Sequence, residues 1–137
     1  MKKKILVVED DQGLRLLYEE EFEEEGYEVS TANNGKEAID KLEKERPDLV
    51  VLDIVMPKMD GMEALGRIIG KQRSIPIILH TSHPGYQEDF MSWGADAFVV
   101  KSPDLKELKG KIRELLEKDR SGLEATRPGK NAAASEG

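Results

Sequence analysis

Short apolar runs alternate along this chain with longer segments in which apolar residues recur at helical spacing. The runs predict five strands, over residues 4–9, 27–32, 48–53, 75–81 and 97–101. The other segments predict helices over residues 13–25, 35–46, 61–73 and 86–93, and a last helix after Ser102. This alternation is typical of α/β proteins with a parallel sheet.

Five strand–helix units predict a doubly wound α/β fold, in which a five-stranded parallel sheet carries helices on both faces. Crossovers between parallel strands are right-handed, so few strand orders remain, and we favour the flavodoxin-like order 2-1-3-4-5. The first and third strands are then neighbours, and ligands bind beyond the carboxyl ends of such strands.

The predicted helices have recognisable start signals and apolar stripes. Asn34 can cap the second helix, and Ser102 can cap the last one with Pro103 in its first turn. The apolar stripes define the residues that we expect to be buried. They are Leu14, Leu17, Tyr18 and Phe22 in the first helix, Ala38, Ile39 and Leu42 in the second, and Leu105, Leu108, Ile112, Leu115 and Leu116 in the last.

Composition narrows the class of protein. The 137 residues suit one domain, and the net charge of −7 argues against non-specific nucleic-acid binding. The chain has no cysteine, which excludes disulfides and thiolate chemistry. No apolar stretch approaches the length of a membrane span, and the N-terminus does not resemble a signal peptide, so we expect a cytoplasmic protein without membrane contact.

Charged and polar residues stand at the ends of several predicted strands. Glu9 and Asp10 follow the first strand, Asp53 ends the third, Thr81 ends the fourth and Lys101 ends the fifth. If these strands are parallel neighbours, the side chains converge at one edge of the sheet. Converging carboxylates repel one another and favour a bound cation. The pattern therefore indicates a divalent metal site.

Magnesium fits this set of ligands because it prefers hard oxygen atoms and retains several waters. We expect Asp10 and Asp53 to bind Mg²⁺ directly, Glu9 to bind it through water, and the backbone carbonyl of Val55 to supply another oxygen. A carboxylate beside such a metal can attack phosphorus and form an aspartyl phosphate. Lys101 would supply a positive charge to the phosphoryl group, and Thr81 a hydroxyl.

Each residue alone has an ordinary explanation. Glu9 and Asp10 could cap the first helix, and Lys101 could be a solvated lysine, but their shared edge favours a site. Six glutamates between Glu19 and Glu25 most simply form a solvated helix face, with docking to a basic partner as the alternative. For His80 and His83 we expect polar loop residues rather than a metal-binding pair.

Two segments resemble the receiver domain of two-component response regulators. Residues 5–11, ILVVEDD, are similar to its acidic first-strand signature, and residues 52–61, LDIVMPKMDG, to its phosphoacceptor segment. Thr81-Ser82, residues 94–96 (GAD) and Lys101 fall where that family has its switch hydroxyl, its turn and its lysine. The resemblance covers about residues 3–120, so we assign residues 1–120 to a receiver domain and expect 121–137 to be a disordered tail.

The resemblance implies a role for each site residue. Asp53 would accept a phosphoryl group from a sensor histidine kinase or a phosphotransfer protein, in a reaction that the receiver itself catalyses. Glu9 and Asp10 would organise Mg²⁺, and Lys101 would pair with the phosphoryl group.

The resemblance also implies a switch. Thr81 would move toward the phosphoryl group, and Phe98 would be the aromatic switch residue. The face made by the fourth helix, fifth strand and fifth helix would then change its affinity for a downstream protein. We expect a stand-alone receiver that does not contact nucleic acid directly and is not a metabolic enzyme.

The chain departs from the family pattern where Ser102 separates Lys101 from Pro103, which leaves the isomer of the Lys101–Ser102 bond open. Val55, two positions after the acceptor, suggests slow self-hydrolysis. It also argues against a rival, an aspartate-nucleophile phosphatase of the haloacid-dehalogenase type, which commonly has a second Asp there. A flavodoxin-like mononucleotide carrier is a second rival, but the acidic residues after the first strand would repel its phosphate. The chain could also be a fragment of a longer regulator.

Overall fold

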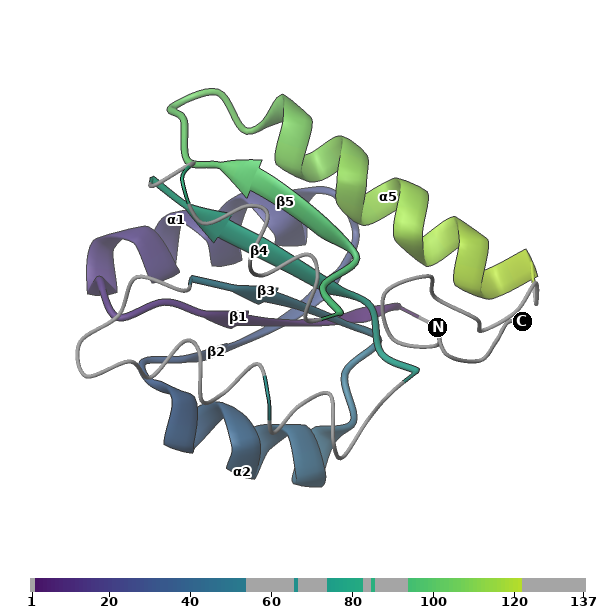
Figure 1. Cartoon of the computed structure of the whole chain (residues 1–137), viewed down its shortest axis with the longest axis horizontal. Helices are drawn as coiled ribbons and strands as arrows, with labels where there is room; N and C mark the ends of the chain where they lie inside the picture. The colour runs from purple at the N-terminus through teal and green to yellow at the C-terminus, as the bar shows by residue number, and fades with distance from the viewer. Residues whose placement is uncertain (1, 54–65, 67–73, 83–84, 86–93, 122–137) are drawn as a thin grey trace.

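The protein is built in three layers, with a parallel sheet between helices (Figure 1). The computed structural model describes residues 2–53, 66, 74–82, 85 and 94–121, and of residues 118–121 only the backbone. The strands are β1 (Lys4–Val8), β2 (Glu28–Ala32), β3 (Leu49–Leu52), β4 (Ile77–Thr81) and β5 (Ala97–Val100). The helices with described bounds are α1 (Gln12–Glu24), α2 (Gly35–Glu45) and α5 (Lys106–Ser121).

The strand order is β2-β1-β3-β4-β5, and every pairing is parallel, which confirms the predicted fold class. The register places Val8 opposite Leu52, and Thr81 opposite Val100. The residues that follow these pairs therefore emerge at the same carboxyl edge of the sheet.

The core consists of two apolar clusters, one on each face of the sheet. Strands β1, β3 and β4 are buried along almost their whole length, as expected for a parallel sheet covered on both sides. One face packs against Tyr18 and Phe22 of α1 and Leu108 of α5. The other packs against Ala38 and Leu42 of α2. These five residues are buried as predicted.

Local signals explain where α1 and α2 begin and end. The Asn34 side chain accepts a hydrogen bond from the Glu37 amide at 2.8 Å, so Asn34 caps α2 as predicted. Asp11, rather than Glu9 or Asp10, caps α1 by accepting from the Leu14 amide at 2.9 Å. Gly26 follows α1 with φ of +98°, a conformation that favours glycine.

The prediction that Ser102 caps the last helix, with Pro103 in its first turn, is wrong, since α5 begins at Lys106. The Ser102 hydroxyl accepts from the Asp104 amide at 3.1 Å, and the Asp104 carboxylate accepts from the Lys106 amide at 2.9 Å. Two successive side-chain bonds therefore form a turn before the helix, and Pro103 lies in that turn. This competition between side chains and the helical backbone is common for Ser and Asp.

Leu17 is not buried as predicted, because 40 % of it is exposed, and Leu16 is 59 % exposed. Tyr18 and Phe22, four residues apart, occupy the buried stripe of α1, and Leu17 is rotated away from them.

In the acidic stretch at the end of α1, Glu21 and Glu25 pair with Lys109 of α5, with nitrogen–oxygen distances of 2.7 and 3.8 Å. Part of that helix face therefore contacts α5 rather than solvent alone.

Several predictions concern residues beyond the described part of the chain. The helices expected over 61–73 and 86–93 fall outside it, apart from Gly66, which is helical. The tail expected over 121–137 also falls outside it, apart from Ser121 at the end of α5. Within the described residues, every helix is too short or too polar to serve as a membrane span.

His80 belongs to the core and not to a loop, contrary to the sequence-based expectation. It lies in β4 with 2 % of its surface exposed, and its ring meets the Tyr18 ring edge-on at 5.3 Å between centroids. Burial, with a smaller contribution from the Lys101 charge, lowers the pKa of His80 to about 4. The imidazole is therefore neutral in the folded protein at pH 7. His83, its suggested metal-binding companion, lies outside the described residues.

Acidification should destabilise the protein through His80. Between pH 6.5 and 4 the unfolded chain binds a proton at this residue and the folded chain does not, so the free energy of unfolding falls by up to about 3 kcal/mol. Glu9 acts in the opposite direction, because its pKa is raised to about 7 in the folded state. Urea unfolding of the wild type and of His80→Leu between pH 6.5 and 4 separates the contribution of His80 from that of Glu9, since Glu9 is present in both proteins. Parallel pH profiles would contradict the assignment.

Gly110→Ala should stabilise the protein by about 0.5–1 kcal/mol, because Gly110 lies inside α5 and a Cβ there would meet nothing within 4 Å. Gly26→Ala is the matched control and should destabilise it, since φ is +98° at that position. Urea unfolding at pH 7.5 measures both changes. A loss of stability in Gly110→Ala would show that α5 does not tolerate a side chain at this position.

Candidate functional site

The candidate site lies at the carboxyl edge of the sheet, where each of three residues continues the strand before it by one further backbone hydrogen bond. The amide of Glu9 donates to the Ala32 carbonyl at 2.9 Å, and that of Asp53 to the Val8 carbonyl at 3.0 Å. The amide of Lys101 donates to the Thr81 carbonyl at 2.7 Å. The backbone of these site residues is therefore fixed by the register of the sheet.

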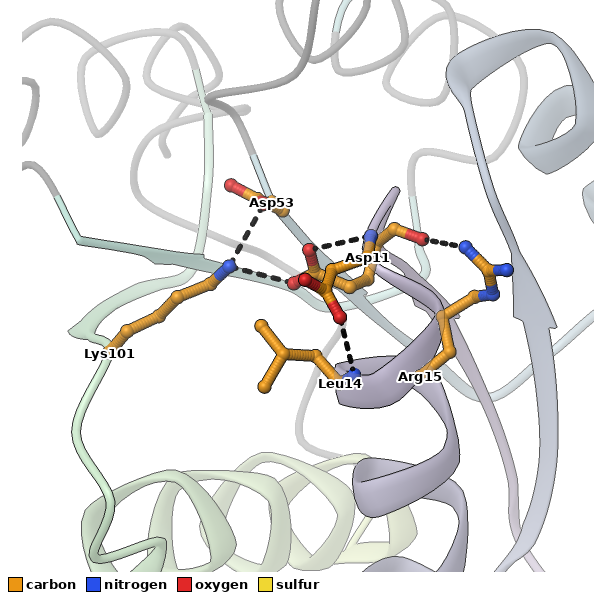
Figure 2. A network of polar contacts seen from close by, with 6 residues as sticks. Asp11, Leu14, Arg15, Asp53 and Lys101 are labelled. Atoms are coloured by element: carbon orange, nitrogen blue, oxygen red, sulfur yellow. Dashed lines mark hydrogen bonds and ion pairs between the residues drawn. The ribbon is translucent and has the colours of Figure 1, made fainter.

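Lys101 joins the two buried carboxylates of the site (Figure 2). Its ammonium lies 2.8 Å from Glu9 Oε1 and 3.0 Å from Asp53 Oδ2. Glu9 is 2 % exposed and Asp53 is 4 % exposed. Charge-assisted hydrogen bonds of this length partly offset the cost of removing the two carboxylates from water.

Asp10 completes an acidic cluster with Glu9 and Asp53. One carboxylate oxygen from each of the three residues lies within 4.8 Å of the others, and Asp10 is exposed to solvent. One lysine cannot neutralise three carboxylates, so the cluster retains a negative potential. Hard oxygen ligands in this number are consistent with Mg²⁺ binding.

The pKa values of Glu9 and Lys101 reflect this crowding. Burial raises the pKa of Glu9 to about 7, and the Asp53 charge adds to the increase, although the hydrogen bond from Lys101 opposes it. Burial alone would lower the pKa of Lys101, but its hydrogen bonds to Glu9 and Asp53 outweigh burial and raise it. Lys101 therefore stays charged, and Glu9 gives up its proton with difficulty.

Thr81 and Phe98 lie on the opposite face of the sheet from His80. Side chains alternate along β4, so His80 faces α1 and Thr81 faces the α2 side. Thr81 is fully buried, and Phe98 is partly buried against the cluster on the α2 side. Phe98 is paired with Leu79, two residues before Thr81, so both predicted switch residues belong to one face of neighbouring strands.

The structure brings together Glu9, Asp10, Asp53 and Lys101, as the strand-end pattern predicts. Val55, whose carbonyl we expected to bind the metal, lies outside the described residues. No cis peptide bond occurs among the described residues, so the Lys101–Ser102 bond, which the sequence left open, is trans.

Two residues of the site were missed from the sequence. Arg15 donates from Nη1 to the backbone carbonyl of Glu9 at 2.8 Å. The Asp11 amide donates to Glu9 Oε2 at 3.3 Å, in addition to the capping role of the Asp11 side chain. The position of Asp11 just before the first helical residue could have signalled the cap, whereas no pattern signals a side chain that returns to a strand-end carbonyl.

Known proteins are similar to this chain in sequence. The model of the response regulator receiver domain family matches residues 5–113. Sporulation initiation phosphotransferase F of Bacillus subtilis is 37 % identical over 118 residues, which are 85 % of this chain and 95 % of that protein. The chain spans only about half the length of other curated relatives that are transcriptional regulators, for example 49 % of one and 48 % of another.

Solved structures of a response regulator share the fold. Response regulator TrrA of Thermotoga maritima, crystallised in complex with Mg²⁺–BeF, is 48 % identical, covers 82 % of this chain and 98 % of its own, and superposes with a TM-score of 0.78. TrrA has also been crystallised in complex with the histidine kinase ThkA. In that structure TrrA is 48 % identical to this chain and superposes with a TM-score of 0.76, and the match covers 83 % of this chain and 98 % of TrrA.

These matches favour the receiver interpretation over the phosphatase and mononucleotide-carrier alternatives. The family model covers most of the chain, from β1 into α5, and includes every residue of the acidic cluster together with Lys101. The chain therefore belongs to the receiver domain family of two-component response regulators.

Proposed function

We propose that this chain is a phosphoacceptor switch in which Asp53 receives a phosphoryl group from a sensor histidine kinase or a phosphotransfer protein. The observation that carries the proposal is the Lys101 ammonium, 3.0 Å from the Asp53 carboxylate at the edge where β1, β3 and β5 end. Phosphoryl transfer needs a nucleophile, a positive charge and a place for a metal ion. The buried Asp53 carboxylate, the Lys101 ammonium and the acidic cluster could supply these three.

In the transfer step an Asp53 oxygen attacks phosphorus while the bond from phosphorus to the donor histidine nitrogen breaks. The electron pair of that bond stays with the imidazole, which leaves as a neutral ring when its other nitrogen carries a proton. Lys101 then pairs with a phosphoryl oxygen instead of with Asp53 and Glu9. The positive charge therefore follows the negative charge as it moves onto the transferred group.

Asp10 and Asp53 would hold Mg²⁺ directly, Glu9 through a water molecule, and Val55 through its carbonyl. The fit rests on three carboxylate oxygens within 4.8 Å of one another, of which those of Asp10 are open to solvent. Bound Mg²⁺ would neutralise charge on the transferring phosphoryl oxygens. The complex of TrrA with Mg²⁺–BeF supports this assignment by analogy.

Phosphorylation would be transmitted through Thr81 and Phe98, which share one face of β4 and β5. The Thr81 hydroxyl would move toward the phosphoryl group, and Phe98 would turn into the space that opens. The face made by the fourth helix, β5 and α5 would then bind a downstream protein with altered affinity. We propose that residues 1–120 form a cytoplasmic receiver domain that makes no nucleic-acid contact and removes its phosphoryl group slowly.

Incubation of the protein with acetyl phosphate and Mg²⁺ should add one phosphoryl group, detected by intact mass and removed by hydroxylamine. Asp53→Asn should prevent the addition, because it removes the nucleophile. Asp40→Asn, a change of the same kind at an exposed position in α2, is the matched control and should leave the adduct intact. An adduct that persists in Asp53→Asn, or its absence in folded wild-type protein, would contradict the proposal.

Lys101→Met should raise the affinity for Mg²⁺ by about tenfold, because the ammonium competes with the cation for Glu9 and Asp53. Calorimetric titration at pH 8, above the raised pKa of Glu9, measures the change. The control is Lys109→Met, which removes a lysine that pairs with Glu21 instead. Equal affinities in the wild type and Lys101→Met would show that the metal binds elsewhere.

A further inference from the structure

Among the described residues, no contact orients the side chain of Asp10, one of the two direct metal ligands in the proposed function. Within the described part of the chain its carboxylate makes no hydrogen bond and no ion pair, and it is exposed. The neighbouring carboxylates of Glu9 and Asp53 repel it. Its position beside them must therefore be imposed by the backbone on either side.

Arg15 holds that backbone on both sides of Asp10. Its guanidinium donates to the carbonyl of Glu9 at 2.8 Å, and its amide donates to the carbonyl of Asp11 at 2.9 Å. Figure 2 shows the Arg15 side chain extending from the first turn of α1 to the end of β1. One residue of α1 therefore fixes the peptide group that precedes Asp10 and anchors the backbone of Asp11, the residue that follows it.

A second pair of contacts makes this segment rigid. The Asp11 amide donates to Glu9 Oε2 at 3.3 Å, and the Asp11 side chain accepts from the Leu14 amide at 2.9 Å. The guanidinium contact is the only one of these that reaches the Glu9 carbonyl among the described residues. Its loss would leave the peptide between Glu9 and Asp10 free to rotate and relieve the repulsion.

We propose that Arg15 is a positioning residue for the metal site, which holds the Asp10 carboxylate close to Asp53 before the cation binds. The inference rests on the proposed function, because it assumes that Mg²⁺ binds at this cluster. Partners of this kind, one step removed from the metal, affect metal affinity by fixing the ligands in place.

The sign of the effect separates positioning from simple electrostatics. The guanidinium is a positive charge near a cation site, so its removal would by charge alone strengthen Mg²⁺ binding. Positioning has the opposite consequence, since a ligand that has rotated away must be returned at a cost in free energy. A fall in affinity on removal of Arg15 therefore cannot come from its charge.

The test is calorimetric titration of Mg²⁺ into the wild type and Arg15→Met, with the melting temperature of each measured in EDTA. We expect the variant to bind Mg²⁺ about tenfold more weakly. Arg113→Met is the matched control: it removes an α5 arginine that pairs with Glu25 at 3.6 Å and should not weaken binding. If Arg15→Met does not fold, Arg15→Gln carries the same expectation, because its side chain is neutral and shorter.

The outcomes distinguish this inference from the proposed function. A wild-type protein that does not bind Mg²⁺ would overturn the proposed function and the inference with it. A wild type that binds Mg²⁺, with Arg15→Met or Arg15→Gln binding equally or more tightly, would overturn the inference alone. A lower melting temperature in EDTA with unchanged affinity would assign Arg15 a structural role and would also overturn it.

Discussion

Repulsion among acidic side chains at one edge of the sheet is the constraint on which the rest of this structure depends. The parallel register brings Glu9 and Asp53 to that edge and buries both, and Asp10 lies beside them. The Lys101 ammonium offsets part of this negative charge, since it lies 2.8 Å from a Glu9 oxygen and 3.0 Å from an Asp53 oxygen. The raised pKa of Glu9, about 7, reflects burial and a negative neighbour that the lysine does not fully offset.

Under the proposed function, this partly compensated cluster has two states. Lys101 can pair with carboxylates, or a cation can replace it and release the ammonium to bind an incoming anionic group. Either state needs the acidic residues to stay in place, which the strand-end hydrogen bonds of Glu9 and Asp53 ensure. Stability and reactivity therefore depend on the same short segment of sheet, and a change in the register of β1 or β3 would remove both.

The sheet and the centre of the site could be predicted because they depend on the positions of buried runs. Strand ends came within two residues of those observed, and the strand order followed from the handedness of crossovers. Once the order is known, Asp53 and Lys101 must lie at the same edge with only β4 between their strands, within reach of a long lysine side chain. That reasoning needs only the residue at the end of each strand.

Features that depend on side-chain direction could not be predicted in this way. The rotation of α1 exposes Leu17, although the residue is as apolar as its buried neighbours. His80 is polar yet buried, because β4 lies between β3 and β5 and is buried along its whole length. The contact of Arg15 with a strand-end carbonyl and the late start of α5 after Ser102 depend on competition between side chains and backbone for hydrogen bonds.

A crystal structure of the protein grown or soaked with Mn²⁺, with diffraction data collected to reveal anomalous scattering, tests the shared cation site most directly. Mn²⁺ takes the same kind of oxygen ligands as Mg²⁺ and can be located by its own signal. Our account predicts one anomalous peak in direct contact with carboxylate oxygens of Asp10 and Asp53, with Glu9 adjacent. A fully occupied peak elsewhere, or none at this cluster at saturating Mn²⁺, would contradict it.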